Sequence, residues 1–184
     1  RITSDNDPDA IEKMSTIDLR FWDHKQNYSG WVKEGLFQTA ILISLMDNRE
    51  DLSLSVSPSE WIDRLISTIL DSSTIEWWYS NKFVLGLIAE ASPRSYIKFI
   101  QNDLRKEDSI IKRLFTPKGV NNLWGPQEDY THILFSLQAM LWEEEWLLPI
   151  SCILADLSRI ENDSNLYNKP ITALYEAYAI WRPQ

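Results

Sequence analysis

The sequence predicts an all-α protein in which antiparallel helical hairpins stack as a fragment of a HEAT-like α-solenoid. One observation is a recurring helix start: Ser57-Pro58 is followed 35 residues later by Ser92-Pro93, and a degraded copy begins at Glu143. Each full copy has a capping residue, then proline at the first helical position. A second observation is apolar spacing typical of helices along most of the 184 residues. A recurring unit of this length is typical of stacked helical repeats.

The first two helices are expected at residues 8–23 and 29–46. Asp7-Pro8 looks like a cap and a first helical residue, and apolar residues then recur every three positions from Ile11. Ser29 can cap the second helix. Because that helix is apolar on most sides after Ala40, we expect it to be central. Residues 1–28 are expected to be peripheral.

The third helix, from Ser57 to about residue 71, has the clearest pattern. Residues 52–56 before it alternate like a strand, but no second strand signal exists to pair with them, so an extended loop is expected. Ser57 caps the helix, and Glu60 completes a capping box. One face then carries the apolar residues Trp61, Ile62, Leu65, Ile66, Ile69 and Leu70.

The rest of the chain continues as helices joined by short connections. Further helices are expected at 75–91, 93–104, 110–115, 126–141, 144–160 and from residue 170 onward. Pro149 lies just past the first turn of one of them and should kink it or remove one hydrogen bond. Short connections favour antiparallel neighbours. The predicted hairpins are therefore 57–71 with 75–91, 93–104 with 110–115, and 126–141 with 144–160.

Composition excludes several classes of protein. The formal net charge is −9, and the sequence pI is about 4.7, which argues against a nucleic-acid-binding surface. No window holds 18 apolar residues, so no membrane span is expected. Cys152 is the one cysteine, which fits a reducing, cytoplasmic compartment. Because Cys152 stands in an apolar run, we interpret it as a buried structural residue.

Tryptophan is unusually frequent, with nine residues in the chain. Exposed indoles could form a stacking platform for sugars or bases. Most of the nine lie within or beside apolar runs, which favours packing between helices instead. The nine are Trp22, Trp31, Trp61, Trp77, Trp78, Trp124, Trp142, Trp146 and Trp181.

No motif identifies a catalytic, cofactor-binding or metal-ligating residue, so we assign none and expect no cofactor. The phosphate-binding P-loop pattern is absent. The two histidines, His24 and His132, and one cysteine are too few for a structural zinc site. We interpret His132 as a residue at the flank of the core, and the run Glu143-Glu144-Glu145 as a solvated helix start.

Four segments carry recognisable patterns: Leu87-Ile88-Ala89-Glu90-Ala91-Ser92-Pro93, 130–142, Asn168-Lys169-Pro170 and Trp181-Arg182-Pro183-Gln184. Together they resemble the helical-repeat region of large, mostly uncharacterised bacterial multidomain proteins. In those proteins the region accompanies a P-loop NTPase module, as in STAND-type signalling or antiviral-defence ATPases. The resemblance covers residues 83–184 and departs from the pattern at Glu143-Glu144-Glu145 and at Pro149.

Three functional hypotheses follow. The first is a non-catalytic interaction module, a scaffold or sensor that spans residues 1–184 as one region of a larger bacterial protein. Its partner would be another protein or neighbouring domains of the parent chain, with no nucleic acid and no membrane. The second is a helical hydrolase in which carboxylates and a divalent ion converge. The third is a structural segment that stabilises a neighbouring domain or oligomer. The carboxylates weighed for the second are Asp63, Glu76, Glu90, Asp129, Glu143 and Asp156.

Overall fold

The computed structural model describes residues 28–48, 55–116, 130–160 and 168–180. Within these ranges every regular element is helical and none is a strand, so the all-α prediction is confirmed there. The expected helix at 8–23 lies outside the described residues, as does most of the loop at 52–56. The same holds for Trp22, His24, Trp124, Asp129 and Trp181.

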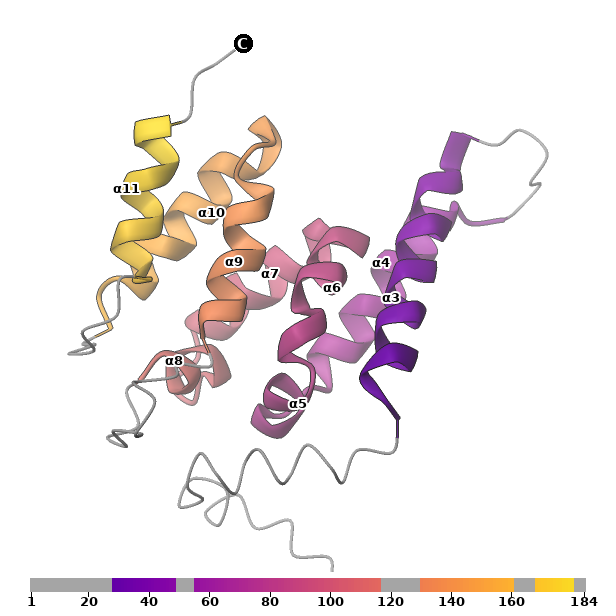
Figure 1. The fold of residues 1–184 in the computed structure, drawn as a ribbon, viewed down its shortest axis with the longest axis horizontal. Helices are drawn as coiled ribbons and strands as arrows, with labels where there is room; N and C mark the ends of the chain where they lie inside the picture. Colours follow the sequence, from indigo (N-terminus) through magenta and orange to yellow (C-terminus); the bar gives the residue numbers. More distant parts are fainter. Residues whose placement is uncertain (1–27, 49–54, 117–129, 161–167, 181–184) are drawn as a thin grey trace, which may run out of the picture.

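The helices lie in two rows (Figure 1). The first row holds α3 (Gly30–Ser44), α6 (Leu85–Ala91), α9 (Thr131–Met140) and α11 (Pro170–Ile180). The second row holds α4 (Pro58–Asp71), α7 (Pro93–Leu104) and α10 (Glu144–Leu157). Within each row, every helix packs against the next one, and the chain passes from one row to the other between consecutive long helices.

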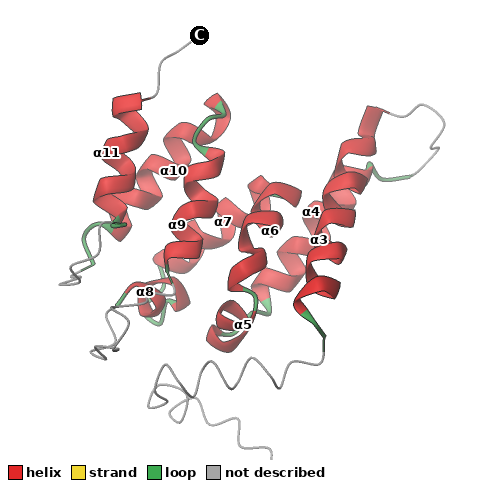
Figure 2. Cartoon of the chain, viewed as in Figure 1, coloured by secondary structure: helices red, strands yellow, loops and turns green. Residues whose placement is uncertain are grey.

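Short helices fill the connections (Figure 2). A 3-10 turn, η2 (Leu45–Asn48), continues α3. Between α4 and α6 lie α5 (Ile75–Ser80) and the 3-10 turn η3 (Lys82–Val84), and α8 (Ile110–Phe115) follows α7. Both α5 and α8 contribute a large buried ring: Trp78 stacks on Phe99, with ring centroids 5.6 Å apart, and Phe115 stacks on Tyr130 at 4.7 Å.

The recurring helix start falls on neighbouring helices of one row. Ser57, Ser92 and Glu143 immediately precede α4, α7 and α10, as predicted from the sequence. The two serines nevertheless form different hydrogen bonds. Ser57 Oγ accepts a hydrogen bond from the backbone N–H of Glu60 (3.2 Å), whereas Ser92 Oγ donates to the carboxylate of Asp63 on α4. The same dipeptide therefore caps one helix and joins the next to its neighbour.

The predicted single helix at 75–91 is interrupted. Asn81 is buried, and both its backbone N–H (3.0 Å) and its side-chain Nδ2 (2.8 Å) donate to the carbonyl of Trp77. Such side-chain bonds to the backbone compete with helix continuation. The helix α4 packs chiefly against α3 and α7, so the predicted hairpin of 57–71 with 75–91 is wrong as the main pairing. The predicted hairpin of 126–141 with 144–160 is wrong in the same way, because α10 packs chiefly against α11 and α7.

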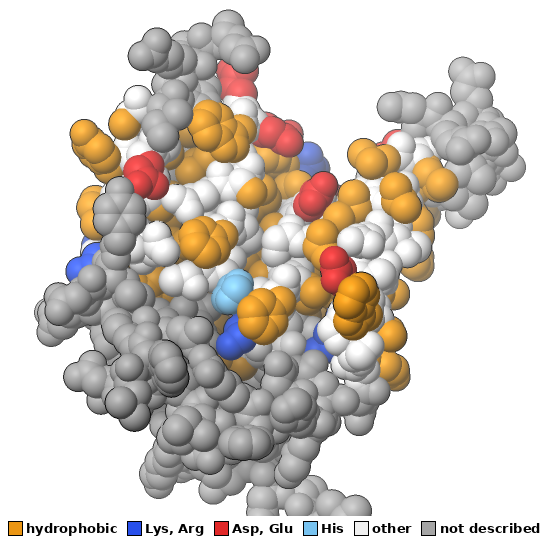
Figure 3. Space-filling view, in the orientation of Figure 1, with side chains coloured by type: hydrophobic (Ala, Val, Ile, Leu, Met, Phe, Trp, Pro, Cys, Tyr) orange, Lys and Arg blue, Asp and Glu red, His pale blue; other side chains and the backbone are white. Residues whose placement is uncertain are grey.

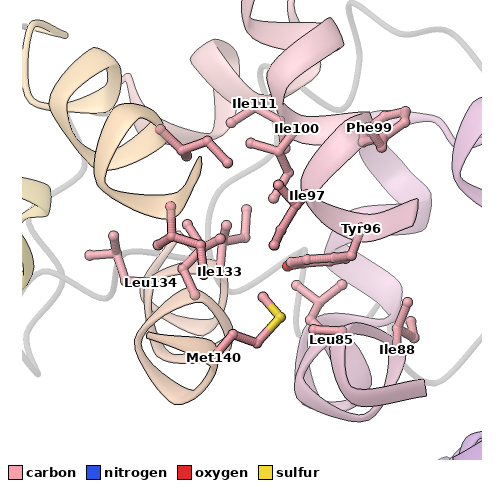
Figure 4. Close-up of a cluster of buried hydrophobic side chains, with 14 of the residues drawn as sticks. Leu85, Ile88, Tyr96, Ile97, Phe99, Ile100, Ile111, Ile133, Leu134 and Met140 are labelled. Carbon is pink, nitrogen blue, oxygen red and sulfur yellow. The ribbon is translucent and has the colours of Figure 1, made fainter. Parts of the chain in front are cut away.

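The core lies between the two rows. Side chains from α6, α7, α8 and α9 interdigitate there, including Leu85, Tyr96, Ile111 and Ile133 (Figure 4). A polar link crosses this apolar layer, because the hydroxyls of Tyr96 and Ser136 lie 2.8 Å apart. Both residues are buried, so the bond ties α7 to α9 within the core.

Among the described helices, α3 is not central, contrary to the sequence-based prediction. It ends the first row, and only Phe37 and Ala40 are buried. Ile41 and Ile43 are partly buried against the core. Trp31, Val32, Leu36 and Leu42 are exposed, and Trp31 is 86% exposed. An apolar run in the sequence shows that a helix has several apolar sides. How many of those sides are buried depends on which helices pack against it in the fold.

A helix crosses a bilayer only if it is long and apolar enough. In the part of the chain that the structure describes, none combines the length and the apolar character needed to cross a bilayer.

Candidate functional site

The carboxylates that the hydrolase hypothesis requires do not form a cluster in the described ranges. Asp63, Glu76, Glu90 and Asp156 lie on α4, α5, α6 and α10, and Glu143 precedes α10. No group of three His, Cys, Asp or Glu side chains among the described residues could hold a metal ion. The carboxylate of Asp63 is instead hydrogen-bonded to Ser92.

Cys152 is exposed, so its interpretation as a buried structural residue is wrong. Ile150 and Ile153 of the same helix are buried. Successive residues of a helix are rotated by about 100°, so Cys152 lies roughly 200° from Ile150 and points away from the core. An apolar run along the sequence did not reveal on which side of the helix the thiol stands.

The tryptophans divide between core and surface. Trp78 is buried and donates its indole N–H to Ser73 Oγ (3.0 Å), as the packing interpretation predicts. Trp31, Trp61 and Trp142 are exposed, so that interpretation is wrong for them. They lie on or beside three different helices, α3, α4 and α9.

The outer face of the first row carries exposed aromatic side chains (Figure 3). Phe83 is 72% exposed and meets the ring of His132 edge-on, with centroids 4.9 Å apart. Lys82 Nζ lies 5.2 Å from the Phe83 ring centroid, and Phe135, 50% exposed, follows His132 by one turn of α9. His132 is half-buried, which agrees with its predicted place at the flank of the core. We call Lys82, Phe83, His132 and Phe135 the first-row aromatic cluster.

A cavity of about 440 Å³ lies between α7, α8 and α10. Its polar lining is Gln101, Arg105, Lys112, Cys152, Asp156 and Arg159. Leu104 and Ile153 contribute apolar walls. Three cationic side chains therefore share this cavity with one carboxylate, although the chain as a whole is strongly acidic.

Internal contacts organise the cationic lining. Arg159 Nη1 lies 3.1 Å from the Asp156 carboxylate, and Lys112 Nζ donates to the carbonyl of Lys106 (3.2 Å). Arg105, at the end of α7, forms no ion pair with any residue in the described ranges. Its guanidinium is thus the cation of the cavity with the most unused donors.

Asp103, buried just before Arg105, fixes the turn that carries two of these cations. Its Oδ2 accepts from Ser109 Oγ (2.7 Å) and from the backbone N–H of Ile111 (2.9 Å). Lys106 Nζ lies 3.4 Å from Oδ1. These contacts hold the start of α8 against the end of α7, and so they set the positions of Arg105 and Lys112.

Sequence reasoning missed the cavity. In the sequence Arg159 stands far from Arg105 and Lys112, so no local grouping of cations signalled the cavity. The sequence could not show that three separate segments meet. Comparison of the chain with protein-family models, curated proteins and solved structures gives no match.

Proposed function

We propose that the chain is a protein-interaction module, a scaffold or sensor segment of a HEAT-like α-solenoid, and that it does not itself catalyse a reaction. The observation that carries the proposal is the placement of one recurring helix start at the head of α4, α7 and α10, three successive helices of one row. Stacked helical units present extended surfaces that typically bind other proteins.

The binding surface of this proposal is the outer face of the first row. The first-row aromatic cluster exposes two phenylalanine rings, and Tyr175 on α11 is also exposed. Aromatic side chains are enriched at protein interfaces because they bury a large area with little loss of conformational entropy. Lys82 beside Phe83 would supply a charged rim. The partner would be another protein or a neighbouring domain of the parent chain.

The proposal extends to the parent protein through the sequence resemblance. A helical-repeat region that accompanies a STAND-type P-loop NTPase would place this segment in a cytoplasmic bacterial signalling or defence protein. In such a protein the interaction module would position the partner, and the NTPase module would supply the chemistry.

A second candidate function, a structural segment that stabilises a neighbour, is favoured by the outer side of α3. Trp31, Val32 and Leu36 are exposed there on consecutive turns. A neighbouring domain packed on this side would remove them from water. No observation in the described ranges favours the carboxylate hydrolase.

Site-specific photo-crosslinking distinguishes these functions. A photoreactive phenylalanine analogue is placed at Phe135 in the first row, at Trp31 on α3, or at Lys98, an exposed residue of the second-row helix α7 that serves as the matched control. The full-length protein is irradiated in the cells that make it, and adducts are identified by mass spectrometry.

The interaction module predicts a defined adduct from position 135 to another protein, and none from position 98. Adducts from position 31 alone, within the parent chain, would favour the structural segment. Equal labelling from positions 135 and 98, or no defined adduct from position 135, would contradict the proposed binding surface.

A further inference from the structure

The cavity between α7, α8 and α10 has a charge opposite to that of the chain. The sequence carries 27 acidic and 18 basic side chains, yet Arg105, Lys112 and Arg159 line this cavity against the single carboxylate of Asp156. A concave site lined by one sign of charge concentrates ligands of the opposite sign. The cavity therefore favours an anion.

The types of hydrogen-bond donor in the cavity indicate which anion it would bind. Arginine offers a planar fork of N–H groups that matches phosphate oxygens, and lysine offers a compact positive charge. Gln101 adds neutral hydrogen-bonding groups at the same wall. Since Asp156 already pairs with Arg159 at 3.1 Å, Arg105 and Lys112 are the groups best placed to meet added negative charge.

The size and walls of the cavity suit a small organic molecule. About 440 Å³ lies within the range of small-molecule sites. Leu104, Ile153 and Ile160 provide apolar surface beside the charged groups. A bare inorganic ion would leave these apolar walls in contact with water, whereas a phosphate ester could cover them with its organic part.

We infer that this cavity is a binding site for a small phosphorylated molecule, with the phosphate held by Arg105 and Lys112 and the organic part against the apolar walls. Because the cavity is formed by α7 and α10, which are neighbours in the second row, the ligand would join two successive helical units. The inference does not depend on the protein partner proposed above.

Cys152 provides a direct test because it is the one cysteine of the chain, is exposed and lines the cavity. The rate of Cys152 alkylation by iodoacetamide, a neutral reagent, is measured with increasing pyrophosphate or a phosphorylated sugar at constant ionic strength. Binding is measured in parallel by isothermal titration calorimetry. At a ligand concentration ten times the dissociation constant, only about one site in eleven is free, so alkylation should slow roughly tenfold.

Two variants test the assigned residues. Arg105→Gln and Lys112→Gln each remove one charged donor and should weaken binding by about tenfold or more. Arg94→Gln is the matched control, because Arg94 is an exposed arginine at the opposite end of α7 and pairs with Glu145 at 3.7 Å. It should bind as the wild type does.

The inference is overturned by any of three results. The first is that neither probe binds, and the second is that a probe binds without slowing alkylation. The third is that the Arg94→Gln control loses affinity as much as Arg105→Gln does. The last result would reveal a general ionic effect. Binding of pyrophosphate and the phosphorylated sugar with equal affinity would keep the phosphate site but remove the contribution assigned to the apolar walls.

Discussion

At the residue scale, Tyr96 connects the two rows through a buried hydroxyl. Its ring is fully buried, and its hydroxyl lies 2.8 Å from Ser136 Oγ, which itself lies 2.8 Å from the carbonyl of Ile133. If Ser136 uses its only proton for Ile133, Tyr96 must donate to Ser136. The order of this chain of hydrogen bonds determines how each residue tolerates substitution.

We predict that Ser136→Ala destabilises the protein more than Tyr96→Phe. The first leaves a buried phenol without its acceptor, which costs about 1–3 kcal/mol, whereas the second removes one hydrogen bond worth about 1 kcal/mol and leaves Ser136 bonded to Ile133. Urea unfolding of both single variants and of the double variant measures these losses of unfolding free energy. The double variant should lie close to Tyr96→Phe; strictly additive costs would contradict the arrangement.

The same residue predicts a loss of stability at alkaline pH. Burial raises the pKa of Tyr96 above its ordinary value of 10.0, and the hydrogen bond with Ser136 opposes this only in part. The unfolded chain therefore releases this proton at a lower pH than the folded chain does. The stabilisation from the protonated phenol is complete below pH 10 and is lost as pH rises toward the folded pKa.

We expect the wild type to lose roughly 1.4 kcal/mol of unfolding free energy per pH unit above pH 10, relative to Tyr96→Phe. Urea unfolding of both proteins at pH 8, 9, 10 and 11 measures the difference, because the other tyrosines titrate in both. A difference that stays constant from pH 8 to pH 11 would show that Tyr96 is not buried as a neutral phenol.

At the element scale, the two serine–proline starts show how one local signal serves two tertiary roles. The backbone of Ser57 is extended, and its hydroxyl faces the open N–H groups of α4. Ser92 directly follows α6, so its buried hydroxyl meets Asp63 on α4 instead, and Ser95 Oγ donates to the Asp63 carbonyl (2.9 Å). Two bonds at the start of α7 thus join neighbouring second-row helices.

We predict that Ser57→Ala and Ser92→Ala both destabilise, but only the second is coupled to Asp63. Ser57→Ala removes a cap worth about 1 kcal/mol. Ser92→Ala removes a bond to a carboxylate, worth about 1.5–3 kcal/mol and less where water reaches Asp63. In double-mutant cycles with Asp63→Ala, Ser92 should show a coupling of at least about 0.5 kcal/mol and Ser57 none beyond error. Equal coupling for both serines would contradict the distinct roles.

Local chemistry explains what could be predicted from the sequence. The starts at Ser57, Ser92 and Glu143 were found because a cap, a proline or acidic first-turn residues act within a single turn. The break at Asn81 was missed because its cause is a side-chain bond that helical periodicity does not report. The cavity was missed because Arg105, Lys112 and Arg159 meet only once α7, α8 and α10 are packed.

At the scale of the whole molecule, contacts run mainly between neighbours. In the first row α6 lies between α3 and α9, and in the second row α7 lies between α4 and α10. The pair of helices in the middle, α6 and α7, has neighbours on both sides, whereas α3 and α11 stand at the two ends of the first row (Figure 1). The proposed stack of helical units implies that stability is approximately a sum of unit and interface contributions, so that separate ends can open separately.

We therefore predict that core substitutions at the two ends open different parts of the molecule. Ile66→Ala in α4 and Ile153→Ala in α10 both truncate a fully buried isoleucine and should cost about 2–5 kcal/mol each. Hydrogen exchange with mass spectrometry should show faster exchange in α3 and α4 for the first variant and in α10 and α11 for the second, while α6 and α7 stay protected longest in both. The two variants serve as controls for each other. If each accelerated exchange equally along the whole described chain, the molecule would unfold as one cooperative unit, and a closed bundle would replace the stacked-unit proposal.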